Sequence, residues 1–196
     1  MKNILLTWNT RWIWKYLEDN LKNNYSILGF SKSNWYDLSI KESFNKIKEN
    51  FWNIKLDYLI LNAWVGEFWK FEENSLEKYE NIINTNLLWN IRLLKILENN
   101  INKDTKIIFI WSIISKKFMK NAAVYQASKF WLRWLAGWLK SEWKKVYILN
   151  PKIVETWFHS WKIKLDKRFT ETKLIDILNV IKNIFSWEEK RFEIDL

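Results

Sequence analysis

Short apolar runs alternate with longer segments of helical periodicity along almost the whole chain. The short runs predict buried strands, and the segments between them carry apolar residues at the spacing of amphipathic helices. The predicted strands cover residues 3–7, 25–30, 56–61, 105–110, 145–149 and 191–195, and the predicted helices cover residues 13–23, 39–51, 75–98, 122–141 and 170–185. Strands that alternate with helices of this length form βαβ units around a parallel sheet, so the order predicts an α/β fold. No linker, repeat or low-complexity segment divides residues 1–196, and we expect a single domain.

Composition excludes several other classes of protein. Hydrophobic residues make up 48% of the chain, too many for a disordered polymer. No apolar run reaches the length of a membrane span. The apolar stretch Met1–Thr7 is too short for a secretory signal and lacks a small-residue cleavage site. The lack of cysteine excludes a disulfide framework and a thiolate metal site, so we expect a cytoplasmic protein with no metal and no membrane partner.

The formal net charge is +10, which raises the question of an anionic partner. The Lys and Arg residues are spread along the chain, mixed with Asp and Glu, and no block of five like charges occurs. This pattern favours a solvated surface over a nucleic-acid site.

Glycine and tryptophan occur in abnormal numbers. The chain has 3 glycines, where average usage would give about 14. It has 16 tryptophans, and the two residue types together match the glycine content of an ordinary α/β protein. Many tryptophans fall at predicted turns and strand ends, namely Trp8, Trp12, Trp14, Trp52, Trp64, Trp111, Trp143 and Trp187. Turns and helix ends favour glycine, because positive φ costs it nothing, which suggests that tryptophan stands in place of glycine.

The junction between the first strand and the first helix carries the most specific motif. Its residues are Thr7, Trp8, Asn9, Thr10, Arg11, Trp12, Ile13 and Trp14. With glycine for tryptophan, the segment resembles the T-G-x-x-x-G-x-G turn of the short-chain dehydrogenase/reductase family. Glycine there permits the tight turn, the approach of a pyrophosphate to the backbone and close packing of helix on strand. An indole at 12 or 14 would fill the space that the diphosphate needs at the helix N-terminus.

The resemblance extends over residues 3 to about 157. Asn62-Ala63-Trp64 resembles the family's N-A-G motif, Phe51–Asp57 resembles its F-G-x-x-D segment, and Trp111-Ser112 resembles a G-S pair. Tyr125 and Lys129 match the Y-x-x-x-K motif, with Ser112 placed 13 residues before the tyrosine. The remaining matches are Asn86 within the long helix, and Asn150-Pro151 followed by Thr156.

This resemblance implies a Rossmann-like, doubly wound parallel sheet between two helix layers, a three-layer αβα domain that binds NAD(P). It also implies reversible hydride transfer between nicotinamide and a carbonyl or alcohol of a small-molecule substrate. Family members are usually homodimers or homotetramers formed through two long helices, here residues 75–98 and 122–141.

Tyr125 and Lys129 lie four residues apart and so share one helix face. A free phenol has a pKa near 10, so acid–base work near pH 7 needs a shift of about 3 units. A neighbouring ammonium can lower the pKa of the phenol by about 1–3 units. The resemblance implies that Lys129 also bonds the nicotinamide ribose, that Ser112 bonds the substrate carbonyl oxygen, and that Asn86 anchors a water in a proton relay to Lys129.

The cofactor preference follows from the end of the second predicted strand. NAD-specific members place an acid there, whereas this chain has Gly29-Phe30-Ser31-Lys32-Ser33. Arg11, Ser31 and Lys32 could hold a 2′-phosphate, so NADP(H) is favoured over NAD(H). The expected cofactor-binding residues are Thr7, Trp8, Asn9, Thr10, Arg11, Trp12, Ile13, Trp14, Ser31, Lys32, Asp37, Leu38, Asn62, Ala63, Trp64, Tyr125, Lys129, Pro151, Val154 and Thr156.

Two departures from the family pattern bear on the substrate side. Lys152 replaces the glycine that usually follows Pro151, and the segment 158–170 is short for a substrate lid. Substrate identity therefore cannot be predicted. The only histidine, His159, has no partner ligands and is expected at the surface.

Two interpretations compete with an NADP(H)-dependent oxidoreductase. A non-catalytic, nucleotide-binding regulator would keep the fold without the chemistry. If tryptophan is taken literally, the chain would be an aromatic-rich nucleic-acid-binding protein, but its tryptophans favour turns over a basic stripe. We expect instead that UGA codons, which some bacteria decode as glycine, have been translated as tryptophan. UGG codons at positions 8, 12 and 14 would exclude that explanation.

Overall fold

The structure is a computed structural model that describes residues 1–7, 11–30, 42–116, 118–142, 145–154 and 171–196, with the backbone alone at residues 11 and 12. Six strands form one sheet in the order β2-β1-β3-β4-β5-β8, and each pairs in parallel with its neighbours. Their bounds are β1 Lys2–Thr7, β2 Tyr25–Phe30, β3 Tyr58–Leu61, β4 Lys106–Ile110, β5 Val146–Asn150 and β8 Glu193–Asp195. This confirms the predicted α/β fold with a parallel, Rossmann-like sheet.

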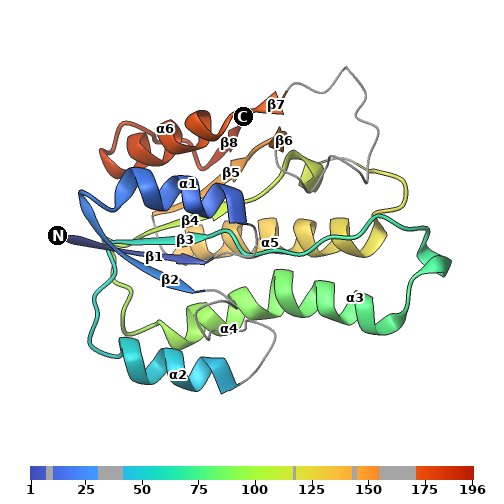
Figure 1. Cartoon of the computed structure of the whole chain (residues 1–196), viewed down its shortest axis with the longest axis horizontal. Coiled ribbons are helices and arrows are strands. Elements are labelled where there is room, and N and C mark those ends of the chain that lie inside the picture. The colour runs from blue at the N-terminus through green and yellow to red at the C-terminus, as the bar shows by residue number, and fades with distance from the viewer. Residues whose placement is uncertain (8–10, 31–41, 117, 143–144, 155–170) are drawn as a thin grey trace.

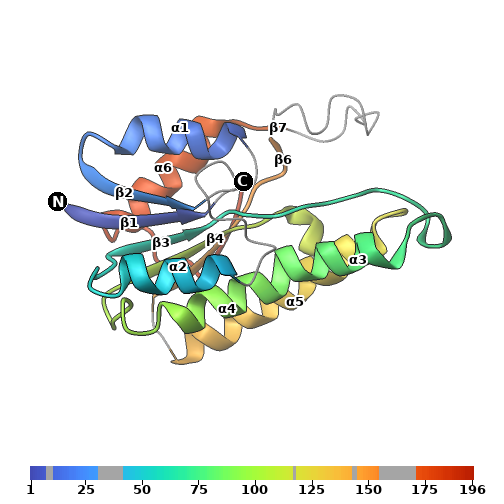
Figure 2. The ribbon, with the colours of Figure 1, turned by 60° about the horizontal axis from the view of Figure 1, so that its bottom comes forward.

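Helices cover both faces of the sheet (Figures 1 and 2). Their bounds are α1 Arg11–Leu21, α2 Glu42–Phe51, α3 Leu76–Ile83, α4 Trp89–Ile96, α5 Ala123–Glu142 and α6 Leu174–Phe185. Helices α1 and α6 lie on one face, where Leu17 and Ile181 pack in one buried cluster. Helices α2, α4 and α5 lie on the other face, where Ile47, Leu93 and Leu132 belong to a second cluster. Strands β3, β4 and β5 are buried along their whole length, which explains why they are continuous apolar runs in the sequence.

The predicted helix 75–98 has a wide turn in its middle. Helix α3 passes into a π-helical turn over Asn84–Leu88, and α4 follows directly. The Ser75 hydroxyl accepts the Lys78 N–H at 3.4 Å and caps the start of α3. Single π turns inside α-helices often mark functional sites, and Asn86 lies within this one.

Some small elements escaped prediction. Strand β6 Ile153–Val154 pairs in parallel with β7 Glu171–Thr172, away from the main sheet. As a result α6 begins at Leu174, four residues after the predicted start. Short 3-10 turns occur at Phe71–Glu73 and Ile113–Lys116. Elements of two to four residues have no period that a sequence pattern can reveal.

Helix α6 ends in a backbone conformation that suits glycine. Trp187, two residues beyond the last helical residue, has a φ of 68°. Its N–H donates to the Ile184 carbonyl at 3.3 Å, and the Glu188 N–H donates to the Asn183 carbonyl at 3.0 Å. This pair of bonds is the Schellman motif, whose left-handed residue is usually glycine.

None of the helices in the described ranges has the length and apolar character needed to cross a membrane.

Candidate active site

The candidate site lies where the strands end. In the register of the sheet, Thr7 is level with Leu61 of β3, and Leu61 with Phe109 of β4. The chain passes from β1 to β2 on one side and then to β3 on the other, so the strand order reverses beside β1. Open α/β sheets bind ligands in the crevice outside such a switch point, at the carboxyl ends of the strands.

Thr7 joins the first two predicted motifs. Its hydroxyl oxygen accepts the Asn62 N–H at 3.1 Å and the Ala63 N–H at 3.4 Å. The same hydroxyl lies 3.5 Å from the Ile60 carbonyl, to which it donates. The side-chain amide of Asn62 is buried, and neither its oxygen nor its nitrogen has a hydrogen-bond partner within the described residues. A cofactor reaching this edge would meet two polar atoms that still need partners.

Asn86 anchors the helix that bears Tyr125 and Lys129. The Asn86 amide oxygen accepts the Val65 N–H at 2.8 Å, and its nitrogen donates to the Val65 carbonyl at 2.8 Å. That nitrogen also donates to the Ser128 hydroxyl at 2.9 Å, and Ser128 in turn donates to the Tyr125 carbonyl at 2.7 Å. Asn86 therefore ties the segment after β3 to helix α5.

Lys129 is buried without a hydrogen-bond partner for its ammonium among the described residues. The nitrogen lies 3.9 Å from the ring centroid of Trp111, 5.1 Å from that of Trp64 and 5.4 Å from that of Tyr125. Burial lowers the pKa of Lys129 to about 7. Two of the three rings nearest to this ammonium are therefore indoles.

Tyr125 is enclosed by three neighbours. Its ring lies 5.9 Å from Trp64 and 5.6 Å from Phe68 between centroids, and a Cβ at Gly66 would come within 3.0 Å of the ring. Burial raises the pKa of the Tyr125 phenol. This direction is opposite to the one that acid–base catalysis needs, and it differs from the lowering predicted from the lysine. The reason is that the indoles bury both groups, and burial also disfavours the lysine charge that would lower the phenol pKa.

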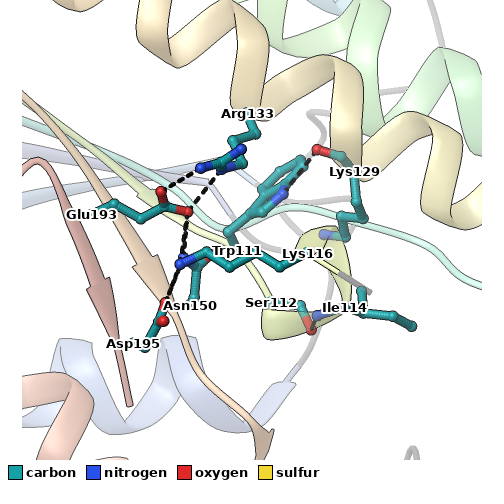
Figure 3. A network of polar contacts seen from close by, with 9 residues as sticks. All are labelled: Trp111, Ser112, Ile114, Lys116, Lys129, Arg133, Asn150, Glu193 and Asp195. Atoms are coloured by element: carbon teal, nitrogen blue, oxygen red, sulfur yellow. Dashed lines mark hydrogen bonds and ion pairs between the residues drawn. The ribbon is translucent and has the colours of Figure 1, made fainter. Parts of the chain in front are cut away.

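Ser112 lies two residues after the end of β4 and immediately before the short turn Ile113–Lys116. Its hydroxyl accepts the Ile114 N–H at 3.3 Å, and its carbonyl accepts the Ser115 N–H at 3.0 Å. Figure 3 shows Trp111 extending from the end of β4 to Lys129, where its indole N–H donates to the Lys129 carbonyl at 3.0 Å. Strand β4 and helix α5 are therefore bridged by an indole beside the serine.

The residues present divide into two kinds with respect to a nicotinamide cofactor. The polar ones fit it, because the Lys129 ammonium and the Asn62 amide are buried groups with unmet hydrogen-bonding capacity. The indoles of Trp64 and Trp111 do not fit it, because they occupy the space around that ammonium. Among the described residues, no group of three or more His, Asp or Glu side chains could hold a metal ion.

The other predicted cofactor residues are placed as follows. Ile13, on α1, is buried in the same core cluster as Leu17 and Ile181, and Trp14 is partly buried against that cluster. Pro151 and Val154, which follow β5, are buried. At Arg11 and Trp12 only the helical backbone is described. The predictions that fall outside the described residues are those at Trp8, Asn9, Thr10, Ser31, Lys32, Asp37, Leu38, Trp143, Thr156, His159 and the segment 158–170.

Some residues of the site were missed in the sequence. Gly66 and Phe68 form a wall beside Tyr125. The Asn90 side chain donates to the Asn86 backbone carbonyl at 2.7 Å and so takes one of the two lone pairs of that oxygen. Gly66 could have been noticed as one of only three glycines in the chain, but nothing in the sequence marks Phe68 or Asn90.

Comparisons with known proteins show the family of the chain. The short chain dehydrogenase family model matches residues 22–163. A short chain dehydrogenase family protein from Francisella tularensis has a similar structure, with a TM-score of 0.82, 16% identity, and coverage of 100% of this chain and 97% of that one. An alcohol dehydrogenase from Thermococcus sibiricus, complexed with 5-hydroxy-NADP, has a TM-score of 0.78 and 20% identity, with coverage of 100% and 96%. A blue fluorescent protein from a metagenomic library, in complex with NADPH, has a TM-score of 0.82 and 15% identity, with coverage of 100% and 96%.

No curated protein matches the chain. The family match nevertheless spans most of its length, and the solved structures share its fold from end to end. The chain belongs to the short-chain dehydrogenase family of NAD(P)-dependent oxidoreductases.

Proposed function

We propose that the protein is an NADP(H)-dependent oxidoreductase that interconverts a carbonyl and an alcohol on a small-molecule substrate. The observation that carries this proposal is the buried, unpaired ammonium of Lys129, 5.4 Å from the Tyr125 ring at the carboxyl edge of the sheet. Among the described residues this ammonium lies against aromatic rings and makes no hydrogen bond, so it has donors left for a ligand. A cofactor ribose hydroxyl is the partner that this arrangement lacks.

The working polypeptide carries glycine where this sequence has tryptophan, at least at the turns and around the site. Two independent features support this part of the proposal. Trp187 holds the left-handed position of a Schellman motif, which glycine adopts without strain. Trp64 and Trp111 cover Lys129, and their replacement by glycine would open the ammonium to solvent and cofactor. Lys129 would then keep its charge at neutral pH and lower the pKa of Tyr125.

Each polar residue has a distinct role in this proposal. When bound, the cofactor supplies or accepts the hydride. Tyr125 donates a proton to the carbonyl oxygen in reduction and accepts it in oxidation. Ser112 donates a hydrogen bond to the same oxygen. Lys129 holds the ribose and lowers the phenol pKa, and Asn86 fixes the helix that bears both, next to a proton-relay water.

The preference for NADP(H) rests on Arg11, Ser31 and Lys32, and on the absence of an acid after β2. Two of the similar solved structures contain NADPH or 5-hydroxy-NADP. Measured with both cofactors, kcat/KM should be higher for NADPH, and substitution of Arg11 by Ala should reduce that preference. Equal kcat/KM values for NADPH and NADH would contradict the assignment.

We also propose a homodimer or homotetramer formed through the helical segment α3–α4 and helix α5. The outer face of α5 exposes Trp131, Trp134 and Trp138 to solvent in the single chain. Glycine at these positions would let a second helix approach closely. Light scattering on the glycine form should give a mass of two or four chains.

A non-catalytic function is favoured only for a polypeptide that truly contains the tryptophans, because burial raises the pKa of Tyr125 in that form. The decisive comparison uses two polypeptides, one with glycine and one with tryptophan at the 16 positions. The glycine form should bind NADPH, unfold cooperatively and reduce carbonyl compounds. The tryptophan form should neither bind NADPH nor reduce carbonyl compounds. Equal NADPH affinity of the two forms would refute the proposal.

A further inference from the structure

Figure 3 shows a network of charged side chains near Trp111 and Ser112 of the candidate site. Its centre is Glu193, at the start of the last strand, whose side chain is only 15% exposed. The Arg133 guanidinium donates two hydrogen bonds to the Glu193 carboxylate, at 2.9 and 2.8 Å. The Asn150 amide donates to Glu193 at 2.8 Å, and the Lys116 ammonium lies 3.2 Å from the same carboxylate oxygen.

The three partners of Glu193 come from three elements that build the site. Lys116 ends the turn that begins next to Ser112. Arg133 lies one helical turn after Lys129 on α5. Asn150 is the last residue of β5 and precedes Pro151. One carboxylate therefore contacts the Ile113–Lys116 turn next to Ser112, helix α5, and the end of β5. The end of β5 leads to Pro151 and the segment expected to bind nicotinamide.

Charge and burial make these contacts stronger than ordinary surface pairs. Partial burial acts to raise the pKa of Glu193, but the hydrogen bonds from Arg133, Asn150 and Lys116 outweigh it and hold the pKa at about 2. Asp195 contributes the second carboxylate, since it accepts from Lys116 at 2.6 Å and from Asn150 at 3.0 Å. Two carboxylates thus face one ammonium and one guanidinium, and the charges of the network balance.

The sheet itself does not depend on these side chains. Strand β8 pairs with β5 through its backbone, with Ile148, Leu149 and Asn150 level with Glu193, Ile194 and Asp195. Ile194 is buried in the core between these two carboxylate residues. Loss of the Glu193 charge should therefore leave β8 paired with β5 but weaken the contacts of residue 193 with Lys116, Arg133 and Asn150.

We propose that Glu193 is a positioning residue, which holds the Ser112 turn against helix α5 so that the Ser112 hydroxyl and the Tyr125 phenol meet at one substrate oxygen. This inference rests on the proposed function. The Ile113–Lys116 turn has other anchors as well: Lys116 also donates to Asp195 at 2.6 Å, the Ile113 N–H donates to the Pro151 carbonyl at 3.1 Å, and Gln126 donates to the Ile114 carbonyl at 3.5 Å. The Glu193 carboxylate differs from Asp195 because it binds Lys116 and Arg133 at once and so links the turn to α5. A displacement of about 1 Å between reacting groups can lower a rate by about 100-fold.

The test compares Glu193→Gln with Glu189→Gln in the glycine form. Glu189 also has a pKa lowered to about 2, chiefly by hydrogen bonds from Arg191, but that partner is two residues away in the same segment. The control therefore removes the charge of a carboxylate that also accepts two hydrogen bonds from an arginine, but whose arginine lies in the same segment of chain. Glu193→Gln should lower kcat by about 10- to 100-fold with the KM for NADPH within about twofold, and Glu189→Gln should change neither.

The same substitution in a Ser112→Ala background separates positioning from a general structural effect. If Glu193 acts by placing Ser112, Glu193→Gln should lower kcat little further once the hydroxyl is gone. An equal loss of kcat in both backgrounds would overturn the proposal, as would a kcat for Glu193→Gln equal to that of Glu189→Gln.

Amide hydrogen exchange tests, without relying on activity, whether Glu193 holds the Ile113–Lys116 turn against α5; we call this link the tether. The N–H groups of Ile114 and Ser115 bond to Ser112, so exchange in a peptide spanning this turn should be faster in Glu193→Gln and unchanged in Glu189→Gln. Unchanged exchange in both variants would refute the tether. If the parent glycine form reduces no carbonyl compound but exchange responds as expected, the proposed function is the part that fails.

Discussion

At the scale of single residues, the charge of Lys129 depends on the two indoles that cover it. Its pKa of about 7 in this form lies below the ordinary value of 10.5 because burial disfavours the ammonium. Between about pH 7 and 10.5 the folded chain therefore binds fewer protons at this site than the unfolded chain, and stability rises with pH through that range. Below about pH 7 the full cost of a buried charge is present.

Replacing Lys129 by Met in the tryptophan form should relieve that cost. At pH 6 we expect the free energy of unfolding to increase by roughly 2–4 kcal/mol, and at pH 10.5 by much less. Urea unfolding at the two pH values measures the difference. A gain of stability that does not vary with pH would contradict the assignment of a buried charge.

The proposed chemistry depends on Tyr125. In the glycine form, Tyr125→Phe should lower carbonyl reduction by at least about 100-fold, because a positioned acid contributes on the order of 10²–10⁴ to a rate. Its affinity for NADPH, measured by fluorescence titration, should stay close to that of the parent. Activity within a few-fold of the parent would exclude Tyr125 as the acid.

At the scale of elements, the end of α6 provides a test of the glycine assignment that needs no activity. Trp187 is held at positive φ, and its ring also lies 3.5 Å from the Lys106 ammonium and 4.2 Å from that of Lys145. Both Trp187→Gly and Trp187→Ala lose the ring, but only alanine keeps the Cβ that disfavours the left-handed conformation. The glycine variant should therefore be the more stable of the two by about 1 kcal/mol in thermal or urea unfolding.

Trp52 supplies the matched position, because it is exposed, lies in a turn and does not have a positive φ. There the alanine variant should be at least as stable as the glycine variant. If the glycine variant is more stable than the alanine variant by the same amount at both positions, the positive φ of Trp187 is not the cause of the difference.

Sequence patterns predicted the large elements well because those elements bury whole faces. Strands β3, β4 and β5 are apolar along their length, and the helices present one apolar side. The π-helical turn at Asn84–Leu88 was not predictable, because it accompanies a contact between Asn86 and the distant backbone of Val65. The same holds for β6 and β7, which pair only with each other across a long sequence separation.

The tryptophans do not all lie at turns, contrary to the main trend in the sequence. Trp131, Trp134 and Trp138 lie on the exposed face of α5, and Trp89 begins α4 wholly inside the core. The Trp89 indole N–H has no hydrogen-bond partner among the described residues, which is costly for a buried donor. Glycine within a helix also costs up to about 1 kcal/mol. The helical positions are therefore weaker evidence than Trp187 that glycine stands in place of tryptophan.

For the candidate site, motif spacing predicted which residues meet but not their electrostatics. Tyr125 and Lys129 lie near each other on α5, as expected, whereas the hydrogen bonds from the Asn62 and Ala63 N–H groups to Thr7 were not predicted. The raised pKa of Tyr125 arises from side chains that fill the crevice in three dimensions. The Glu193 network was equally hidden, because its members lie up to 79 residues apart.

At the scale of the whole molecule, family membership favours binding of a nicotinamide cofactor, whereas the indoles at the candidate site oppose it. The two observations agree if the tryptophans are glycines in the working protein, as we propose. The fold matches known short-chain dehydrogenases over its full length. At the candidate site, however, the indoles of Trp64 and Trp111 lie against Lys129, at positions where the proposed function needs a cofactor.

The most direct test is mass spectrometry of the protein purified from its native cells, with sequencing of the peptide that spans positions 8, 12 and 14. We predict glycine at all three positions, and an intact mass reduced accordingly. Tryptophan at these positions in a protein that nevertheless oxidises NADPH would contradict the account.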